Sequence, residues 1–276
     1  MGEVRVLTSQ DVADVRRLLG ARPIDNIQLA SRVKMYGVDG FRLGNDLLGY
    51  VDKGQLVSCL SDGHSLNVVN ATPAALDAFS RRLENRHCGS IIGVRDEAMG
   101  LWTRLCERSF TQWASPREVR DHQLVMALTT DPLVRGDPRV LVATTRYLDT
   151  YHAASVAMYT EEVGVAPADA QGAYRNHVAT LMMRGLGFCA LSQGRVIFKA
   201  DIVASAGQIC QIGGVWLDPA LRGRGLSEPL MAAVAARCRE RYSTLCLYVN
   251  SYNHPAVKCY RAIGFKQVSE CATILY

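Results

Sequence analysis

The stretch from Gly213 to Ser227, which reads GGVWLDPALRGRGLS, constrains the fold of this chain more than any other part of the sequence. An apolar run is followed by a short segment with two spaced glycines and then by the start of an amphipathic helix. Gly223 and Gly225 permit positive φ angles, and the first turn of a helix presents backbone N–H groups to a nearby anion. A strand, a glycine-bearing turn and a helix in this order predict a site for a phosphate or pyrophosphate group.

A second informative segment, Leu245 to Phe265, reads LCLYVNSYNHPAVKCYRAIGF. We interpret it as a strand, a polar loop and a helix that begins at Pro255 and ends before Gly264. Proline at the first helical position and glycine just after the last one are typical of helix boundaries. The two segments therefore predict two successive strand–turn–helix units, the first of which binds an anion.

In combination, these segments resemble the GCN5-related N-acetyltransferase (GNAT) family. The first matches the pyrophosphate motif R/Q-x-x-G-x-G/A, with Ser227 in place of its final glycine or alanine, and the second matches the segment LYVN…N-x-x-A…Y…GF. The resemblance covers about half of the chain, from Arg139 to the end, and further segments (VAMYTEEVGV, VIFKADI, GGVWLDP) are similar to tandem GNAT proteins of actinobacterial type. It implies an α/β fold with a central, mostly antiparallel twisted sheet flanked by helices.

The resemblance also implies acetyl-CoA as the cofactor, with CoA as a product and no metal. The implied cofactor-binding residues are Val215, Trp216, Leu217, Arg222, Gly223, Arg224, Gly225, Leu226, Ser227, Asn250, Asn253 and Tyr260. In the family the strand before the glycine turn carries a bulge and diverges from the next strand. Gly213 and Gly214 suit such a bulge. The strand edge exposed there would donate an N–H to the thioester carbonyl.

The catalytic groups are implied partly by the resemblance and partly by chemistry. Tyr260 matches the tyrosine that protonates the departing thiolate, a role that suits a phenol. The acceptor amine must lose a proton before it attacks, and the carboxylates of Asp201, Glu161 and Glu162 are candidates for the base. The terminal carboxylate of Tyr276 is a further alternative, and the sequence does not choose among them.

The first half of the chain shares the order of elements but not the chemistry. At 276 residues the chain exceeds one ordinary domain, and turn-forming residues accumulate between Thr129 and Arg139. We therefore predict a domain over residues 1–130 and a catalytic domain over residues 139–276. In the first domain the segment Asn70 to Pro73 stands where the glycine turn should be, and its proline removes a donor. We expect a degenerate GNAT-like domain that binds no CoA.

The periodicity of the sequence predicts mixed α/β structure in both halves. Ser9 and Thr72 are read as helix caps, and the chain is expected to end in a pair of strands. Predicted strands are Glu3 to Leu7, Leu47 to Val51, Gln55 to Leu60, Ser65 to Val69, Ser90 to Val94, His122 to Leu128, Phe188 to Leu191, Val196 to Ala204, Gln208 to Leu217 and Thr244 to Val249. Predicted helices include Glu97 to Cys106, Tyr147 to Tyr159, Ala173 to Gly185 and Leu226 to Arg241.

Composition excludes several classes of protein. The net charge of +5 is mild and no basic run occurs, so nucleic acid is not expected as a partner. Apolar stretches are far shorter than the ~20 residues of a membrane span, and no apolar leader begins the chain. The nine cysteines are scattered without a CxxC pair, which predicts buried free thiols in a reducing, cytoplasmic location rather than disulfides or a metal site.

We therefore expect acetyl transfer to a primary amine by direct attack within a ternary complex. One alternative is acylation of a single small metabolite amine, as in the tandem-domain mycothiol synthases that this arrangement resembles. Another is a non-catalytic acyl-CoA-binding module. The sequence leaves open whether the acceptor is a small molecule or a peptide or protein amine, which acyl length is preferred, and whether the chain forms a homodimer.

Overall fold

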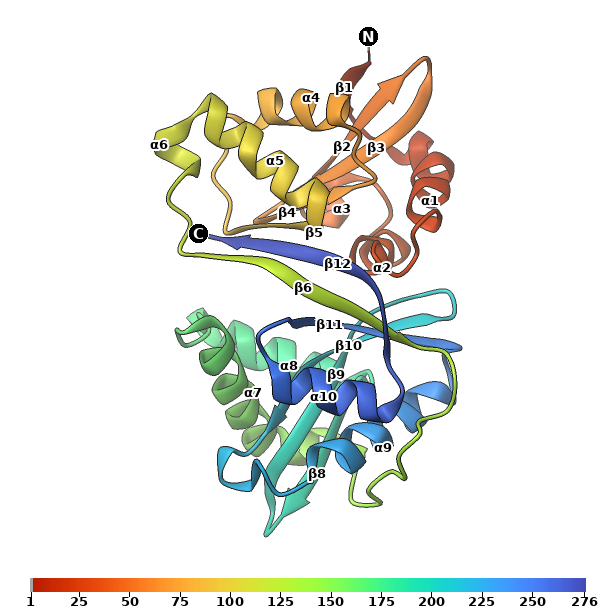
Figure 1. The fold of residues 1–276 in the computed structure, drawn as a ribbon, viewed down its shortest axis with the longest axis vertical. Helices are drawn as coiled ribbons and strands as arrows, with labels where there is room; N and C mark the ends of the chain where they lie inside the picture. The colour runs from red at the N-terminus through yellow and green to blue at the C-terminus, as the bar shows by residue number, and fades with distance from the viewer. Residues whose placement is uncertain (1) are drawn as a thin grey trace. The chain divides into compact units, whose positions relative to one another are not determined.

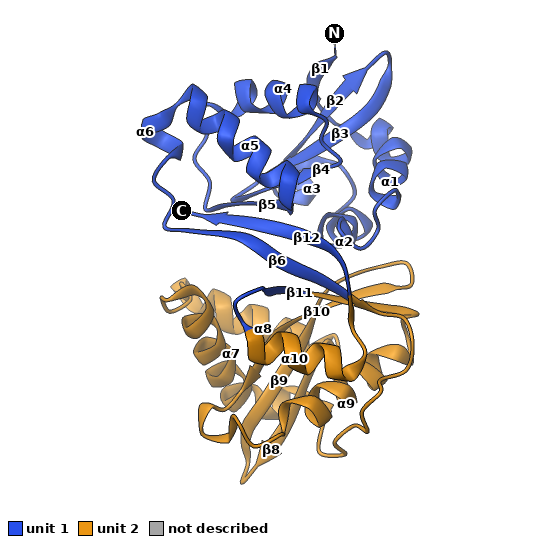
Figure 2. Cartoon of the chain, viewed as in Figure 1, with its two compact units in different colours: residues 1–126, 248–253, 267–276 blue, residues 127–247, 254–266 orange. Residues whose placement is uncertain are grey.

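The computed structural model describes residues 2–276 and divides into two compact units that interleave along the sequence. Unit 1 comprises the residues up to Met126 together with Tyr248–Asn253 and Gln267–Tyr276, and unit 2 comprises Ala127–Leu247 and His254–Lys266 (Figure 2). The units are therefore not two contiguous halves, because two C-terminal segments belong with the N-terminal part of the chain.

Unit 1 is a mixed sheet with helices on both faces (Figure 1). Its strands, in the order in which they lie in the sheet, are β1 (Glu3–Val6), β2 (Asp46–Asp52), β3 (Gln55–Asp62), β4 (Ser65–Val69), β5 (Ser90–Val94), β12 (Lys266–Leu275) and β6 (Glu118–Leu128). The first residue of β12 and the last two residues of β6 belong to unit 2. Its helices are η1 (Ser9–Asp11), α1 (Val12–Gly20), α2 (Ile27–Tyr36), α3 (Gly40–Leu43), α4 (Pro73–Leu83), α5 (Arg95–Arg108) and α6 (Phe110–Trp113). Strand β4 pairs with β5 in parallel, and β12 pairs with β5 in antiparallel orientation.

The two faces of this sheet follow the alternation of side chains along its strands. Leu60 and Leu66 point to the face that α4 and α5 cover and pack with Phe79 and other residues of one buried cluster. Cys59 and Val69 point to the opposite face and pack in a second cluster with residues of α1 and α2. The sheet of unit 1 is thus buried between two helical layers.

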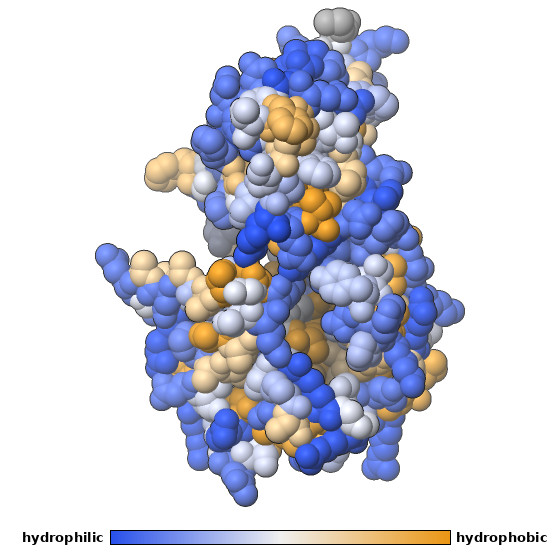
Figure 3. All heavy atoms as spheres, turned by 60° about the vertical axis from the view of Figure 1, so that its left-hand side comes forward, coloured by the Kyte–Doolittle hydropathy of each residue, from blue (hydrophilic) through white to orange (hydrophobic). Residues whose placement is uncertain are grey.

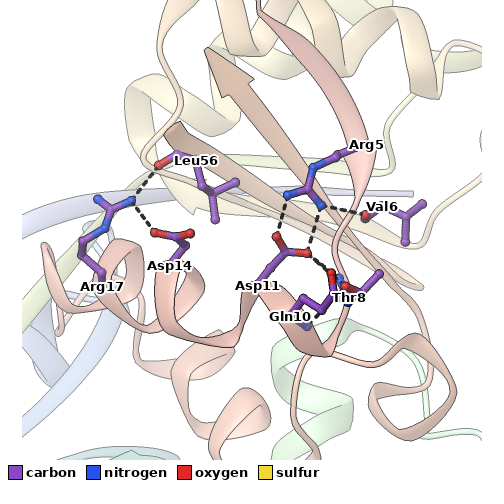
Figure 4. A network of polar contacts seen from close by, with 8 residues as sticks. All are labelled: Arg5, Val6, Thr8, Gln10, Asp11, Asp14, Arg17 and Leu56. Carbon is purple, nitrogen blue, oxygen red and sulfur yellow. Dashed lines mark hydrogen bonds and ion pairs between the residues drawn. The ribbon is translucent and has the colours of Figure 1, made fainter. Parts of the chain in front are cut away.

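The first helix of unit 1 begins differently from the expectation. Thr8, and not Ser9, is the capping residue, and it forms a capping box in which Asp11 accepts from the Thr8 N–H at 2.8 Å. Arg5 donates to both carboxylate oxygens of Asp11, at 2.9 and 2.5 Å (Figure 4). Serine and threonine are both common capping residues, and serine is the somewhat better one, so the sequence favoured Ser9 over Thr8.

Unit 2 has a five-stranded arrangement in the order β11 (Thr244–Asn250), β10 (Ile209–Leu217), β9 (Arg195–Ala206), β8 (Gly187–Ser192) and β7 (Leu141–Val142), of which the last three residues of β11 belong to unit 1. Its helices are η2 (Thr145–Tyr147), α7 (Leu148–Val163), η3 (Ala170–Gly172), α8 (Ala173–Met183), η4 (Pro219–Leu221), α9 (Ser227–Arg239) and α10 (His254–Ile263). Tyr151 of α7 and Val178 of α8 pack against Trp216 in one buried cluster. All strand pairs of unit 2 are antiparallel except β10 with β11.

The mixed α/β fold with a mostly antiparallel sheet is confirmed. The expected final strand pair is wrong, since a single long strand, β12, follows α10.

All nine cysteines are free and seven are buried. On the face drawn in Figure 3 most surface residues are hydrophilic, with small separate hydrophobic patches. No helix within residues 2–276 has the length and hydropathy needed to cross a membrane.

Candidate functional site

A β-bulge interrupts strand β10 where the glycine pair occurs. Gly213 is opposite Asp201 and Trp216 is opposite Lys199, so β10 has one more residue than β9 over this interval. Gly214 has a φ of +56°, which a residue with a side chain rarely adopts. The bulge therefore lies where the glycine pair predicted it, and it bends β10 out of the regular ladder.

Strands β10 and β11 are paired only at their beginning. The registered pairs are Ile209 with Thr244, Cys210 with Leu245 and Gln211 with Cys246. Both strands continue beyond these residues, but they form no further residue pairs with each other in the part of the chain that the structure describes. Separation of two parallel strands next to a bulge leaves backbone groups of β10 available for a ligand.

The turn between β10 and α9 concentrates backbone donors. Gly223 and Gly225 have φ values of +73° and +71°, and residues 222–225 are exposed. The N–H groups of residues 223–228 have no hydrogen-bond acceptor anywhere in residues 2–276. The first helical residue of α9 is Ser227, and no side chain among the described residues caps this helix. Uncapped N–H groups at a helix start and left-handed glycines are features that favour anion binding in proteins.

The arginine at the start of this turn is already engaged by the protein. Arg222 Nε donates to the carbonyl of Leu217 at 3.0 Å, and its Nη2 lies 2.8 Å from Glu161 Oε2 on α7. Both side chains are almost half exposed. Glu161, one of the three candidate bases, is therefore the ion-pair partner of the turn.

Asp201 lies in a buried polar network behind the bulge. Lys199 Nζ contacts Asp201 Oδ2 at 2.5 Å and donates to the Gly214 carbonyl at 2.9 Å. The Tyr151 hydroxyl donates to Asp201 Oδ1 at 2.5 Å. Lys199 is 1% exposed and Asp201 5%. Both oxygens of this second candidate base are thus occupied by donors, and burial, with the nearby Asp201 charge, raises the pKa of Tyr151.

Tyr260 lies on α10 with its ring edge-on to Phe265, at 6.0 Å between centroids. The side chain is 8% exposed, and its hydroxyl has no hydrogen-bond partner in the described part of the chain. Burial raises the pKa of this phenol, and the nearby charges of Cys259 and Glu162 raise it further. Glu162, the third candidate base, is thus the carboxylate whose charge reaches the predicted general acid. The pKa of Tyr174 is raised to about 12, mainly by burial, and the charge of Glu162 contributes to this shift.

The remaining predicted residues lie in unit 1. Asn250 Oδ1 accepts from Gln123 Nε2 at 2.9 Å, and the Asn253 N–H donates to the Asn250 carbonyl at 2.9 Å. Tyr276 packs edge-on against Trp113 at 5.7 Å, and its hydroxyl donates to the Trp113 carbonyl at 2.9 Å. The structure thus groups the turn, the bulge, Tyr260 and the three acidic residues in unit 2, separately from these asparagines and Tyr276.

Sequence reasoning missed two members of the site. Lys199 and Tyr151 were not singled out, although both are buried and both contact Asp201. The sequence does contain a signal that could have identified Lys199. Alternation along a strand places residues i and i+2 on one face, so a lysine and an aspartate two apart in the apolar run VIFKADIV form a natural buried pair.

Comparison with protein families gives two matches in separate parts of the chain. Residues 185–274 match a family described as "FR47-like protein", and residues 45–151 match one described as "Domain of unknown function (DUF4081)". No curated protein sequence matches this chain.

Solved structures of the same fold span the whole chain. A GCN5-related N-acetyltransferase from Sphaerobacter thermophilus is 15% identical with a TM-score of 0.61, covering 99% of this chain and 95% of its own. A tandem GNAT protein from the clavulanic acid biosynthesis pathway is 13% identical with a TM-score of 0.59, covering 100% and 98%. A Drosophila protein is 14% identical with a TM-score of 0.68, covering 100% and 99%. The chain therefore has the tandem GNAT fold.

Proposed function

We propose that this protein is an acyl-CoA-dependent N-acetyltransferase that transfers the acetyl group of acetyl-CoA to a primary amine and releases CoA. The observation that carries the proposal is the row of acceptor-free N–H groups at residues 223–228, beside two left-handed glycines. Several converging donors can replace the water lost by a pyrophosphate. The tandem GNAT fold supports the same assignment.

The turn fits the pyrophosphate of CoA in shape and in charge. A Cβ atom at Gly223 or Gly225 would meet no atom within 4 Å, so the space above the turn is open and only the backbone conformation demands glycine. Arg224 is exposed beside it and adds positive charge. Residues Val215–Leu217 of β10 would lie along the pantetheine arm, which brings an activated thioester to the unpaired part of the strand.

Deprotonation of the amine falls to Glu162 in this proposal. Glu162 is exposed on α7, and its charge reaches Tyr260. A carboxylate close to the general acid suits a base that accepts the proton of the incoming ammonium, directly or through water.

Tyr260 then donates a proton to the CoA thiolate. Burial and the neighbouring negative charges raise its pKa, so the phenol is fully protonated at neutral pH. Its hydroxyl makes no competing hydrogen bond within residues 2–276, which leaves its proton available for the leaving group.

Calorimetric titration of the intact chain with CoA tests whether the protein binds the cofactor that the proposal requires. One CoA per chain is expected, because the described residues of unit 1 offer no equivalent turn. The absence of saturable binding would overturn the proposal. A screen for CoA release from acetyl-CoA with small amines and with peptides would then identify the acceptor class, and binding without release on any amine would favour a non-catalytic acyl-CoA module.

A further inference from the structure

The buried pair Lys199–Asp201 is an unusual feature in the core of unit 2. Removing two charges from water is costly, and a buried ion pair rarely repays that cost by stability alone. Here the pair has a third partner, since Lys199 also donates to the carbonyl of Gly214 in the bulge. Tyr151 completes the group, with its hydroxyl on Asp201 and its ring centroid 5.2 Å from the Lys199 nitrogen.

The surrounding backbone is adapted to this network. A Cβ at Gly214 would lie 2.5 Å from Asp201 Oδ2 and 2.9 Å from Lys199 Nζ. A Cβ at Gly187 would lie 2.8 Å from the Tyr151 hydroxyl oxygen. Glycine at both positions therefore leaves room for the polar groups, and the bulge carbonyl reaches the ammonium without an intervening side chain.

The direction of one peptide group follows from these contacts. The carbonyl of Gly214 and the N–H of Val215 belong to the same planar trans peptide, so they point in opposite directions. Because Lys199 holds the carbonyl on the side of Asp201 and Tyr151, the Val215 N–H points away from the network. A cation on the carbonyl oxygen also polarises the peptide and makes its N–H a stronger donor.

We infer that Lys199 is a positioning residue for acyl transfer, which fixes and polarises the Gly214–Val215 peptide so that the Val215 N–H donates to the thioester carbonyl. Asp201, which accepts from Lys199 and from Tyr151, holds the Lys199 amino group in place. This inference rests on the proposed function, since it needs an acyl thioester beside β10. It assigns Asp201 a role behind the site, in place of proton abstraction from the amine.

The test uses the carbonyl stretch of ¹³C-labelled acetyl-CoA bound to the intact protein, measured by infrared difference spectroscopy. A hydrogen bond to the thioester oxygen lowers the stretching frequency, and this readout requires no knowledge of the acceptor. The double variant Lys199→Met with Asp201→Asn removes both charges together and so avoids an unpaired buried ion. It should bind CoA with nearly unchanged affinity but lose most of the frequency shift.

Two further variants sharpen the test. Lys199→Gln with Asp201→Asn keeps a neutral donor for the Gly214 carbonyl, so it should retain an intermediate frequency shift. This variant tests the inference if the methionine variant does not fold. Tyr151→Phe removes only the donor to Asp201 and should keep most of the shift. A wild-type shift in either folded double variant would overturn the inference. Failure of the wild-type protein to bind acetyl-CoA would instead overturn the proposed function.

Discussion

The turn from β10 to α9 in unit 2 and the turn from β4 to α4 in unit 1 hold the same place in the topology of their units. In each, a strand pairs in parallel with the strand after the helix, through Ser65 with Ser90 in unit 1 and through Ile209 with Thr244 in unit 2. The turn has only three residues, 70–72, in unit 1, but nine, 218–226, in unit 2.

The short turn of unit 1 satisfies its own polar groups. Thr72 caps α4 by accepting from the Ala75 N–H at 3.2 Å, and Pro73 has no N–H to offer. The side chain of Asn70, which has a φ of +52°, donates to the Leu18 carbonyl at 2.7 Å and accepts from Arg22 at 2.7 Å. An anion would have to displace bonds that the chain makes to itself. The two turns therefore differ in length and in capping, although the fold around them is the same.

The largest expected effect comes from forcing a side chain into the open turn. Gly225→Val should abolish measurable CoA binding, because a β-branched residue does not adopt a φ of +71° and the N–H groups would lose their common direction. Each donor lost to a charged group is worth about 1.5–3 kcal/mol. Gly194→Val is the matched control, since Gly194 has a φ of +76° and equally open surroundings in the β8–β9 turn. Equal loss of affinity in both variants would argue against the site.

The next effect concerns turnover and not binding. Tyr260→Phe keeps the ring packed on Phe265 but removes the proton donor, so kcat should fall by about 10²- to 10⁴-fold with little change in CoA affinity. Because burial and adjacent charges raise the pKa of Tyr260, its loss of a proton should not reduce wild-type kcat at any pH up to about 9.5. A basic limb near pH 8 that disappears in Tyr260→Phe would contradict this assignment.

A smaller effect is expected in unit 1, where polar groups stabilise the chain itself. The hydrogen bond from Arg5 lowers the pKa of Asp11 to about 2, against the opposing influence of burial. A carboxyl whose pKa is lowered on folding stabilises the protein above its unfolded pKa of about 4, and this contribution is lost as the pH falls towards 2. Asp11→Asn should therefore cost about 1–2 kcal/mol of unfolding free energy at pH 7. Urea denaturation should show the difference from wild type shrinking between pH 4 and pH 2.

Figure 4 also shows a matched control for this change, the ion pair between Asp14 and Arg17, both of which lie on α1. Their nitrogen and oxygen lie 3.2 Å apart with both side chains 59% exposed. An exposed pair contributes little, so Asp14→Asn should be close to neutral at every pH. A cost for Asp14→Asn equal to that of Asp11→Asn would contradict the role assigned to the hydrogen bonds between Arg5 and Asp11.

The smallest expected effect is at the closed turn. Thr72→Ala should lower the free energy of unfolding by about 1 kcal/mol through loss of the helix cap, and Thr72→Ser should restore it. Neither change should alter the CoA stoichiometry measured by calorimetry. A second CoA site in Thr72→Ala would mean that the cap alone closes unit 1 to the ligand.

Local features of the sequence were sufficient to predict the start of α4 and the bulge of β10. Thr72 and Pro73 marked the start of α4, and Gly213 and Gly214 marked the bulge, because each requires a particular backbone geometry at a particular residue. Helix α2, Ile27–Tyr36, was missed because no side chain caps its first turn, so its start lacks the signal that marks α4. The contacts of Asp201 and Glu161 were not foreseen, since their partners lie far along the chain and periodicity carries no information about which elements meet.

Strand β12 gives the chain a particular order of folding during synthesis. It pairs with β5 from Cys271 opposite Val94 to Leu275 opposite Ser90, so the sheet of unit 1 contains residues made almost two hundred positions after their neighbours. The unit that begins the polypeptide is consequently completed only after nearly all of unit 2 has left the ribosome. Until then the edge of β5 is an unpaired strand that a chaperone, or a second nascent chain, could recognise. A stop codon before residue 267 would accordingly damage the N-terminal unit, far from the lesion in sequence.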